Sequence, residues 1–180
     1  MKTLITGGAR SGKSSYAQER AEKSGKKVMF VATAEAYDDE MRLRIEAHKR
    51  SRPSFWTTLE TPSKVGRAIR VTLSDEEVIL IDDITLLVNA VFNRFGEHLD
   101  QQDIEKAVLE EISELIETMK HLDKEFLIVT NEVGLGLVPD NEAGRFYRDA
   151  LGRANKLLAE FCDEVYLMVS GIPLKIKPGR

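Results

Sequence analysis

The chain has 180 residues, of which 26 are Lys or Arg and 30 are Asp or Glu, so its formal net charge is −4. Apolar residues make up 42% and charged residues 31%, a balance that excludes intrinsic disorder for most of the chain. An acidic chain is also a poor non-specific binder of nucleic acid, which requires concentrated Lys and Arg. Any anion site must therefore be local, and the length predicts one domain over residues 1–180.

Cysteine content and apolar runs indicate the compartment. The single cysteine, Cys162, excludes an intramolecular disulfide and any zinc site built from several cysteines. The amino terminus reaches Gly-Gly-Ala-Arg after six residues, without the apolar core of a signal peptide, and no apolar run approaches the roughly 20 residues of a membrane span. We expect a soluble protein of the reducing cytoplasm.

Short apolar runs rich in β-formers alternate along the chain with segments of helical periodicity. The runs predicted as strands are residues 3–6, 27–33, 77–82, 125–130 and 165–170, with 171–177 as a candidate edge strand. The predicted helices are residues 13–24, 38–51, a segment that starts at Pro62 with Thr61 as N-cap, 84–95, 102–121 and 141–161. This alternation predicts an α/β fold with a mainly parallel sheet and helices on both faces.

Ligands of such sheets bind at the carboxyl ends of the strands. That rule selects five places: residues 7–14, residues 33–35, Asp82-Asp83, Asn131-Glu132 and Ser170-Gly171.

The first strand end carries a phosphate-binding motif. Residues 7–14 fit the pattern G-x-x-x-x-G-K-S/T and lie between a predicted strand and a predicted helix; they are Gly7, Gly8, Ala9, Arg10, Ser11, Gly12, Lys13 and Ser14. Glycines allow backbone N–H groups to point at phosphate oxygens, next to the positive end of a helix dipole. Lys13 is expected to reach the β- and γ-phosphates and Ser14 to ligand Mg²⁺. The alternative, an ordinary glycine-rich turn, is disfavoured by this context.

A second strand end supplies a carboxylate for the metal. The run VILI precedes Asp82-Asp83 in the manner of a Walker B motif, and Asp82 is the better metal candidate. The alternative is that both acids only solvate the loop or cap the next helix, and Asp83 is the better cap. No Asn-Lys-x-Asp guanine signature follows, which argues against a regulatory GTPase.

A basic cluster surrounds one histidine at His48-Lys49-Arg50-Ser51-Arg52. Neutral imidazole is a competent nucleophile at phosphorus, and adjacent cations favour the neutral form while attracting an anionic substrate. The alternative is a solvated helix end, where cations suit the dipole. His98, in a polar stretch, and His121, at a predicted helix end, are weaker candidates.

Several segments together carry a resemblance that covers essentially the whole chain: GGARSGKS at 7–14, VATAE at 31–35, DDEMRLRIEAHKRSRP at 38–53, ITLLVNAVF at 84–92, TNEVGLGLVPDN at 130–141 and VSGIPLKIK at 169–177. They resemble the bifunctional adenosylcobinamide kinase / adenosylcobinamide-phosphate guanylyltransferase family of cobalamin biosynthesis. The resemblance implies a RecA-like P-loop fold and a homotrimer, consistent with the apolar helix 84–95 needing cover. It also implies two reactions: phosphorylation of adenosylcobinamide with ATP or GTP, then transfer of GMP from GTP, which gives adenosyl-GDP-cobinamide and pyrophosphate.

The resemblance also implies roles for individual residues. His48 would carry the guanylyl group and Lys13 would assist catalysis. The implied nucleotide contacts are residues 7–14, Ala32, Thr33, Ala34, Lys49, Arg50, Ser51, Arg52, Glu60 and Asp82, with Ser14 and Asp82 as metal ligands. Family members can have Glu at the Asp82 position, so a direct contact of Asp82 with base or ribose does not follow.

Three questions stay open at this level. No general base for the kinase step is identified; Glu132 is a candidate base or metal partner, and a structural hydrogen-bonding role is the alternative. Neither the corrinoid contacts nor the preferred phosphoryl donor follows from the sequence. The other functions considered are a monofunctional P-loop kinase of a small metabolite and a RecA-like ATPase on nucleic acid, and the net charge of −4 argues against the latter.

Overall fold

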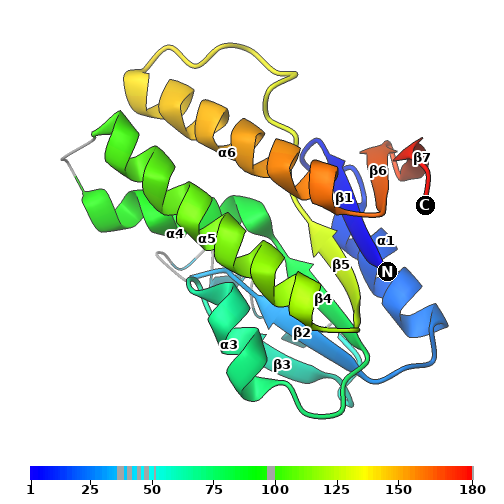
Figure 1. Cartoon of the computed structure of the whole chain (residues 1–180). Coiled ribbons are helices and arrows are strands. Elements are labelled where there is room, and N and C mark those ends of the chain that lie inside the picture. Colours follow the sequence, from blue (N-terminus) through cyan, green and yellow to red (C-terminus); the bar gives the residue numbers. More distant parts are fainter. Residues whose placement is uncertain are drawn as a thin grey trace.

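A computed structural model describes residues 1–35, 39, 42–43, 46, 49–50, 52–96 and 100–179. The strands are β1 (Lys2–Gly7), β2 (Val28–Ala32), β3 (Thr57–Glu60), β4 (Val78–Asp82), β5 (Glu125–Val129), β6 (Glu164–Val169) and β7 (Ile172–Lys177). The helices are α1 (Lys13–Lys23), α3 (Val65–Thr72), α4 (Ile84–Phe95), α5 (Gln101–His121) and α6 (Glu142–Phe161), as Figure 1 shows. In this part of the chain no helix is long and apolar enough to cross a membrane.

The described strands form one sheet in the order β3-β2-β4-β5-β1-β6-β7. All neighbours are parallel except β6 and β7, which form an antiparallel hairpin at one edge. The register places Ala32, Asp82 and Val129 level with one another at the carboxyl edge. Because β1 and β6 end at this edge as well, residues that are distant in the sequence gather there.

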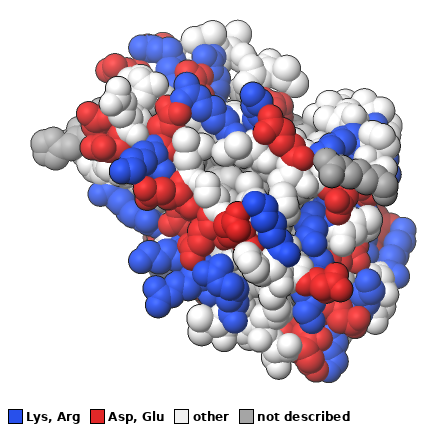
Figure 2. Space-filling model, viewed as in Figure 1, with Lys and Arg blue, Asp and Glu red and all other residues white. Residues whose placement is uncertain are grey.

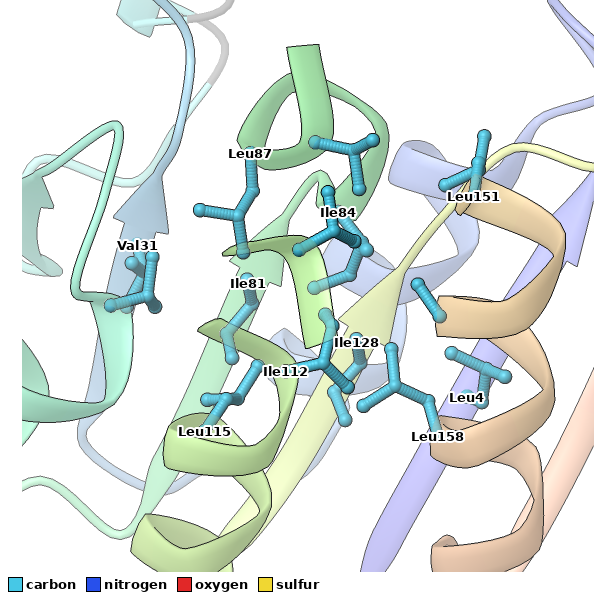
Figure 3. Close-up of a cluster of buried hydrophobic side chains, with 14 of the residues drawn as sticks. Leu4, Val31, Ile81, Ile84, Leu87, Ile112, Leu115, Ile128, Leu151 and Leu158 are labelled. Carbon is cyan, nitrogen blue, oxygen red and sulfur yellow. The ribbon is translucent and has the colours of Figure 1, made fainter. Parts of the chain in front are cut away.

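The core lies on both faces of the sheet because successive strand residues point to opposite sides. On the face in front in Figure 1, the strands pack against α3, α4, α5 and α6. Figure 3 shows part of this cluster, in which side chains of the strands meet those of three helices: Leu4, Val31, Ile81, Ile128, Ile84, Leu87, Ile112, Leu115, Leu151 and Leu158. On the opposite face Ile5, Phe30 and Leu80 pack against Ala17 and Ala21 of α1. The predicted α/β fold with helices on both faces is confirmed.

One local prediction differs from the structure. The helix expected from Pro62 with Thr61 as N-cap begins instead at Val65, with Lys64 as N-cap. Thr61 continues the line of the preceding strand, since its N–H donates to the Ala32 carbonyl at 2.9 Å, and the Lys64 N–H donates to a carboxylate oxygen of Glu111 on α5 at 2.7 Å. A tertiary contact therefore caps this helix in place of the local Thr-Pro signal.

Strand β3 was not predicted, because its exposed residues Thr57, Thr58 and Glu60 give it no apolar run. The candidate edge strand at 171–177 is confirmed as β7. The helix predicted at 38–51 falls mostly on residues outside the described part of the chain.

Candidate nucleotide-binding site

The phosphate loop connects β1 to α1 at the carboxyl edge of the sheet. Two of its glycines are required by their surroundings. Gly7 has φ of +151°, and a Cβ there would lie 2.5 Å from the Met168 carbonyl oxygen of β6. Gly12 precedes α1 with φ of +91°, and a Cβ would lie 3.3 Å from Cα of Gly171 in the β6–β7 turn. The loop is thus held closely against the hairpin, where the Gly171 N–H also donates to the Ser11 carbonyl at 3.0 Å.

Lys13 closes the loop from inside. Its side chain is buried, and Nζ donates to the Gly8 carbonyl oxygen at 2.7 Å. Burial lowers the pKa of Lys13, while the nearby carboxylates of Asp83 and Asp82 act in the opposite direction. Gly8, Ala9 and Arg10 are exposed at the outer side of the loop, while Ser11 is buried and its hydroxyl has no hydrogen-bond partner.

A hydroxyl of α1 and a carboxylate at the end of β4 meet beside the loop. The Ser14 hydroxyl of α1 donates to Oδ1 of Asp82, the last residue of β4, at 3.0 Å. Both groups are hard oxygen ligands of the kind that Mg²⁺ takes, usually together with substrate phosphates and water. The residues present therefore fit the predicted Mg²⁺. Within the described residues no cluster of three or more His, Cys, Asp or Glu could hold a metal ion.

Asp83 has a different role from its neighbour. Its Oδ1 accepts the Leu86 N–H at 3.0 Å and so caps α4, as predicted. Its Oδ2 accepts from the Asn131 amide at 3.1 Å, and the same amide donates to the Thr85 hydroxyl at 2.9 Å. Burial, followed by the charge of Asp82, raises the pKa of Asp83 to about 6, against the opposing effects of Leu86, Thr85 and Lys13.

The end of β2 is fastened to this turn. The Thr33 hydroxyl donates to the Asp83 carbonyl at 2.6 Å and lies 2.9 Å from the Asp83 N–H, which donates to it. Thr33 is fully buried, Ala32 is buried and Ala34 is half-buried. The predicted nucleotide-contacting residues 32–34 therefore lie next to Asp82 and Asp83. The Thr33 hydroxyl is already hydrogen-bonded to the Asp83 backbone.

The described residues of the basic segment, Lys49, Arg50 and Arg52, precede β3, and Lys49 lies beside the end of that strand. Lys49 forms an ion pair of 2.5 Å with Glu60, and Arg50 an exposed one of 3.6 Å with Glu46. The Arg52 guanidinium lies 3.6 Å from the centre of the Phe30 ring, and its Nε and Nη1 are buried without a hydrogen-bond partner. Burial lowers the pKa of Arg52, while Asp82 and Glu60 act in the opposite direction.

Two of the predicted residues, His48 and Ser51, lie outside the described residues, as does His98. His121 is exposed at the end of α5, where Nδ1 lies 2.7 Å from the Glu117 carbonyl oxygen. The structure thus brings residues 7–14, residues 32–34, Arg52 and Asp82 to one edge, with Lys49 and Glu60 paired beside them.

The segment after β5 was selected as a ligand-binding strand end, with Glu132 as a candidate base or metal partner or in a structural hydrogen-bonding role, but the hydrogen-bond network around it was not predicted. The Glu132 N–H donates to the Gly7 carbonyl at 2.9 Å, and its carboxylate accepts the Gly134 N–H at 2.6 Å. The amide of Asn155 donates to the Asn131 carbonyl at 3.0 Å, and the Tyr147 hydroxyl donates to the Thr85 carbonyl at 2.9 Å. Asn155 and Tyr147 lie on α6, and nothing in their local sequence signals these contacts.

Comparison with known proteins decides the family. The model of the family described as "Cobinamide kinase / cobinamide phosphate guanyltransferase" matches residues 3–176. The chain belongs to this family.

Curated relatives of the cobinamide kinase family span the whole chain. The "Bifunctional adenosylcobalamin biosynthesis protein CobU" of Salmonella typhimurium is 42% identical and that of Escherichia coli 40%, each covering 98% of this chain and 100% of the relative. "Bifunctional adenosylcobalamin biosynthesis protein CobP" of Pseudomonas aeruginosa is 38% identical, with 98% of each chain covered.

Solved structures show the fold alone. The RadB recombinase matches with a TM-score of 0.52 at 16% identity, covering 92% of this chain and 73% of that one. A Pyrococcus horikoshii protein matches with a TM-score of 0.58 at 9% identity, covering 98% and 86%. The RecA-like P-loop architecture predicted from the sequence is confirmed.

Proposed function

We propose that this protein, as one domain over residues 1–180, phosphorylates adenosylcobinamide with ATP or GTP and then transfers GMP from GTP to adenosylcobinamide phosphate. The products of the second step are adenosyl-GDP-cobinamide and pyrophosphate. Two findings together carry the proposal. The chain belongs to the cobinamide kinase family over residues 3–176, and its P-loop places the Ser14 hydroxyl 3.0 Å from the Asp82 carboxylate.

In the kinase step the chain positions the nucleotide and offsets its charge. The N–H groups of residues 7–14 and the start of α1 surround the phosphates, and Lys13 exchanges its contact with the Gly8 carbonyl for the β- and γ-phosphates. Lys13 is already buried, so little water has to be displaced around it when the phosphates arrive.

Ser14 and Asp82 are the residues that would hold Mg²⁺. When bound, the ion would offset negative charge on the phosphate oxygens. Asp83 keeps the turn in place through its cap on α4 and its bond to Asn131, so that Asp82 stays beside Ser14.

In the guanylyl transfer, His48 is the proposed nucleophile. A ring nitrogen attacks the α-phosphorus of GTP, the bond to the bridging oxygen breaks, and pyrophosphate leaves. A phosphate oxygen of adenosylcobinamide phosphate then attacks the same phosphorus and the histidine leaves.

We propose that Lys49, Arg50, Ser51, Arg52 and Glu60 contact the nucleotide in this step, together with Ala32, Thr33 and Ala34. The two unpartnered buried nitrogens of Arg52 support this role, since a phosphate would satisfy them.

Incubation with α-labelled GTP and Mg²⁺ tests the second activity. We expect acid-labile, alkali-stable label on the protein, and its loss in His48→Ala. His121→Ala is the matched control and should keep the label, because His121 lies at the exposed end of α5. A wild-type protein that phosphorylates cobinamide without taking up label would be a monofunctional kinase, and the guanylyl-histidine proposal would then be wrong.

We further propose that the enzyme is a cytoplasmic homotrimer. The single cysteine suits a reducing compartment. A trimer is supported by the exposed apolar side chains of β7, which are 54–69% exposed at Ile172, Leu174 and Ile176.

A further inference from the structure

The segment that joins β5 to α6 carries three solvent-exposed aliphatic side chains. Leu135 is 83% exposed, Leu137 95% and Val138 66%. In Figure 1 the segment runs along the upper rim of the molecule into the start of α6, and in Figure 2 uncharged atoms gather along that rim. Aliphatic side chains this exposed are costly in water and commonly mark a binding surface.

Both ends of this segment are fixed. At the β5 end, the Glu132 N–H bonds to Gly7 of the phosphate loop at 2.9 Å. At the α6 end, Nη1 of Arg145 donates to the carbonyls of Pro139 at 3.1 Å and Asp140 at 2.9 Å. The aliphatic side chains are therefore presented from a braced loop that is tied directly to the nucleotide site.

An open hollow of about 410 Å³ lies next to the segment, between α4 and the start of α6. Its lining includes the amides of Asn89 and Asn93, the rings of Phe92 and Tyr147, and Gly144, and it contains no charged side chain. Gly144 touches Pro139, since a Cβ there would lie 2.8 Å from Cβ of Pro139, which follows Val138 in the chain. The hollow and the aliphatic segment thus adjoin.

The hollow is within reach of the phosphoryl site. Helix α4 starts directly after Asp82-Asp83, at Ile84. With a rise of about 1.5 Å per residue, Asn89 lies about 9 Å and Asn93 about 15 Å along the axis from Asp83. A ligand that covers the hollow can therefore extend a short arm to the γ-phosphate.

We propose that this surface, the hollow together with Leu135, Leu137 and Val138, binds the corrin ring of cobinamide. The inference rests on the proposed function and adds the place of its acceptor. A corrin is a broad macrocycle with apolar faces and a rim of neutral carboxamides. Aliphatic and aromatic side chains suit the faces, the two asparagine amides suit the rim, and the uncharged lining disfavours a second nucleotide.

Equilibrium dialysis of the full-length protein with adenosylcobinamide, followed by its visible absorption, tests the proposal. We expect Leu137→Asp and Asn93→Ala each to raise the Kd for adenosylcobinamide at least tenfold, and to leave the Kd for ATP within twofold. Val71→Asp is the matched control, because Val71 is 79% exposed on α3 and lies outside the proposed surface.

Unchanged cobinamide affinity in both variants would overturn the proposal. Sedimentation velocity on the same variants shows whether the surface instead contacts a second copy of the chain. A Leu137→Asp protein that loses its assembly and keeps the affinity would also overturn the proposal, since the segment would then contact a second copy of the chain. A wild type that binds ATP and not adenosylcobinamide would overturn the proposed function itself, and this inference with it.

Discussion

At the scale of single residues, two adjacent glycines of the phosphate loop differ sharply in what they require. Gly7 has a left-handed φ of +151° and no room for a side chain, since its Cβ would meet backbone at 2.5 Å. Gly8 has nothing within 4 Å of the same position. Both glycines belong to the same loop motif. Of these two, only Gly7 has to be glycine because of its packing against β6.

We expect Gly7→Ala to lower the free energy of unfolding by about 2–4 kcal/mol, because backbone strain and the clash with Met168 add together. Gly8→Ala should change it by less than about 0.5 kcal/mol. Urea unfolding of both variants measures the difference. Equal losses in the two would contradict the geometric account.

At the scale of secondary-structure elements, one carboxylate joins three of them. Glu164 of β6 is buried and accepts from Arg20 of α1 at 2.9 Å and from Lys175 of β7 at 2.5 Å. Burial tends to raise the pKa of Glu164, but the hydrogen bonds and charges of Lys175 and Arg20 outweigh it and hold this pKa below its ordinary value. The ionised form is therefore favoured in the folded state.

The sign of the pH effect follows from that lowered pKa. The contribution of Glu164 to stability is present above its unfolded pKa and declines as the pH falls through the lower folded value. We expect Glu164→Gln to cost about 1 kcal/mol at pH 7, and this cost to shrink as the pH falls through the lowered folded pKa of Glu164. Urea unfolding at several pH values measures it, and a cost that grows on acidification would refute the assignment. Glu125→Gln, which removes a single and more exposed ion pair with Lys26, is the control.

Most elements could be predicted because their signals are local. The apolar runs of β1, β2, β4 and β5 and the asparagine and aspartate caps of α4 and α6 are readable in the chain. Strand β3 could not be found, since its side chains are exposed and only its pairing with β2 makes it a strand. The start of α3 depends on Glu111, 47 residues away from Lys64.

The candidate site follows the same division. The loop 7–14 and Asp82 were identified from motifs that act through their own backbone and side chains. The bonds that hold Asn131 against Asp83 and Asn155 join three segments, and such contacts are determined by topology. Sequence reasoning found the strand ends and not the network that connects them.

At the scale of the whole molecule, the sheet concentrates function at one edge. Strands β1, β2, β4, β5 and β6 all end there, so Lys13, Asp82, Asn131 and Gly171 converge from across the chain. Strand β7 forms one lateral edge of the sheet and β3 forms the other, and no described strand lies beyond β7. Apolar edge strands are prone to contact other chains.

The proposed trimer predicts a role for that edge. Ile172, Leu174 and Ile176 recur every second residue, which places them on one face of β7, and each is more than half exposed. A lysine in the middle of this row would be desolvated without a partner if copies of the chain meet there. We expect Leu174→Lys to convert a particle of three 20.3 kDa chains into single chains in sedimentation equilibrium, while Val71→Lys, at a more exposed position on α3, leaves the particle intact. A trimer that survives Leu174→Lys would place the contact elsewhere, and a wild type that sediments as one chain would remove the trimer from the proposal.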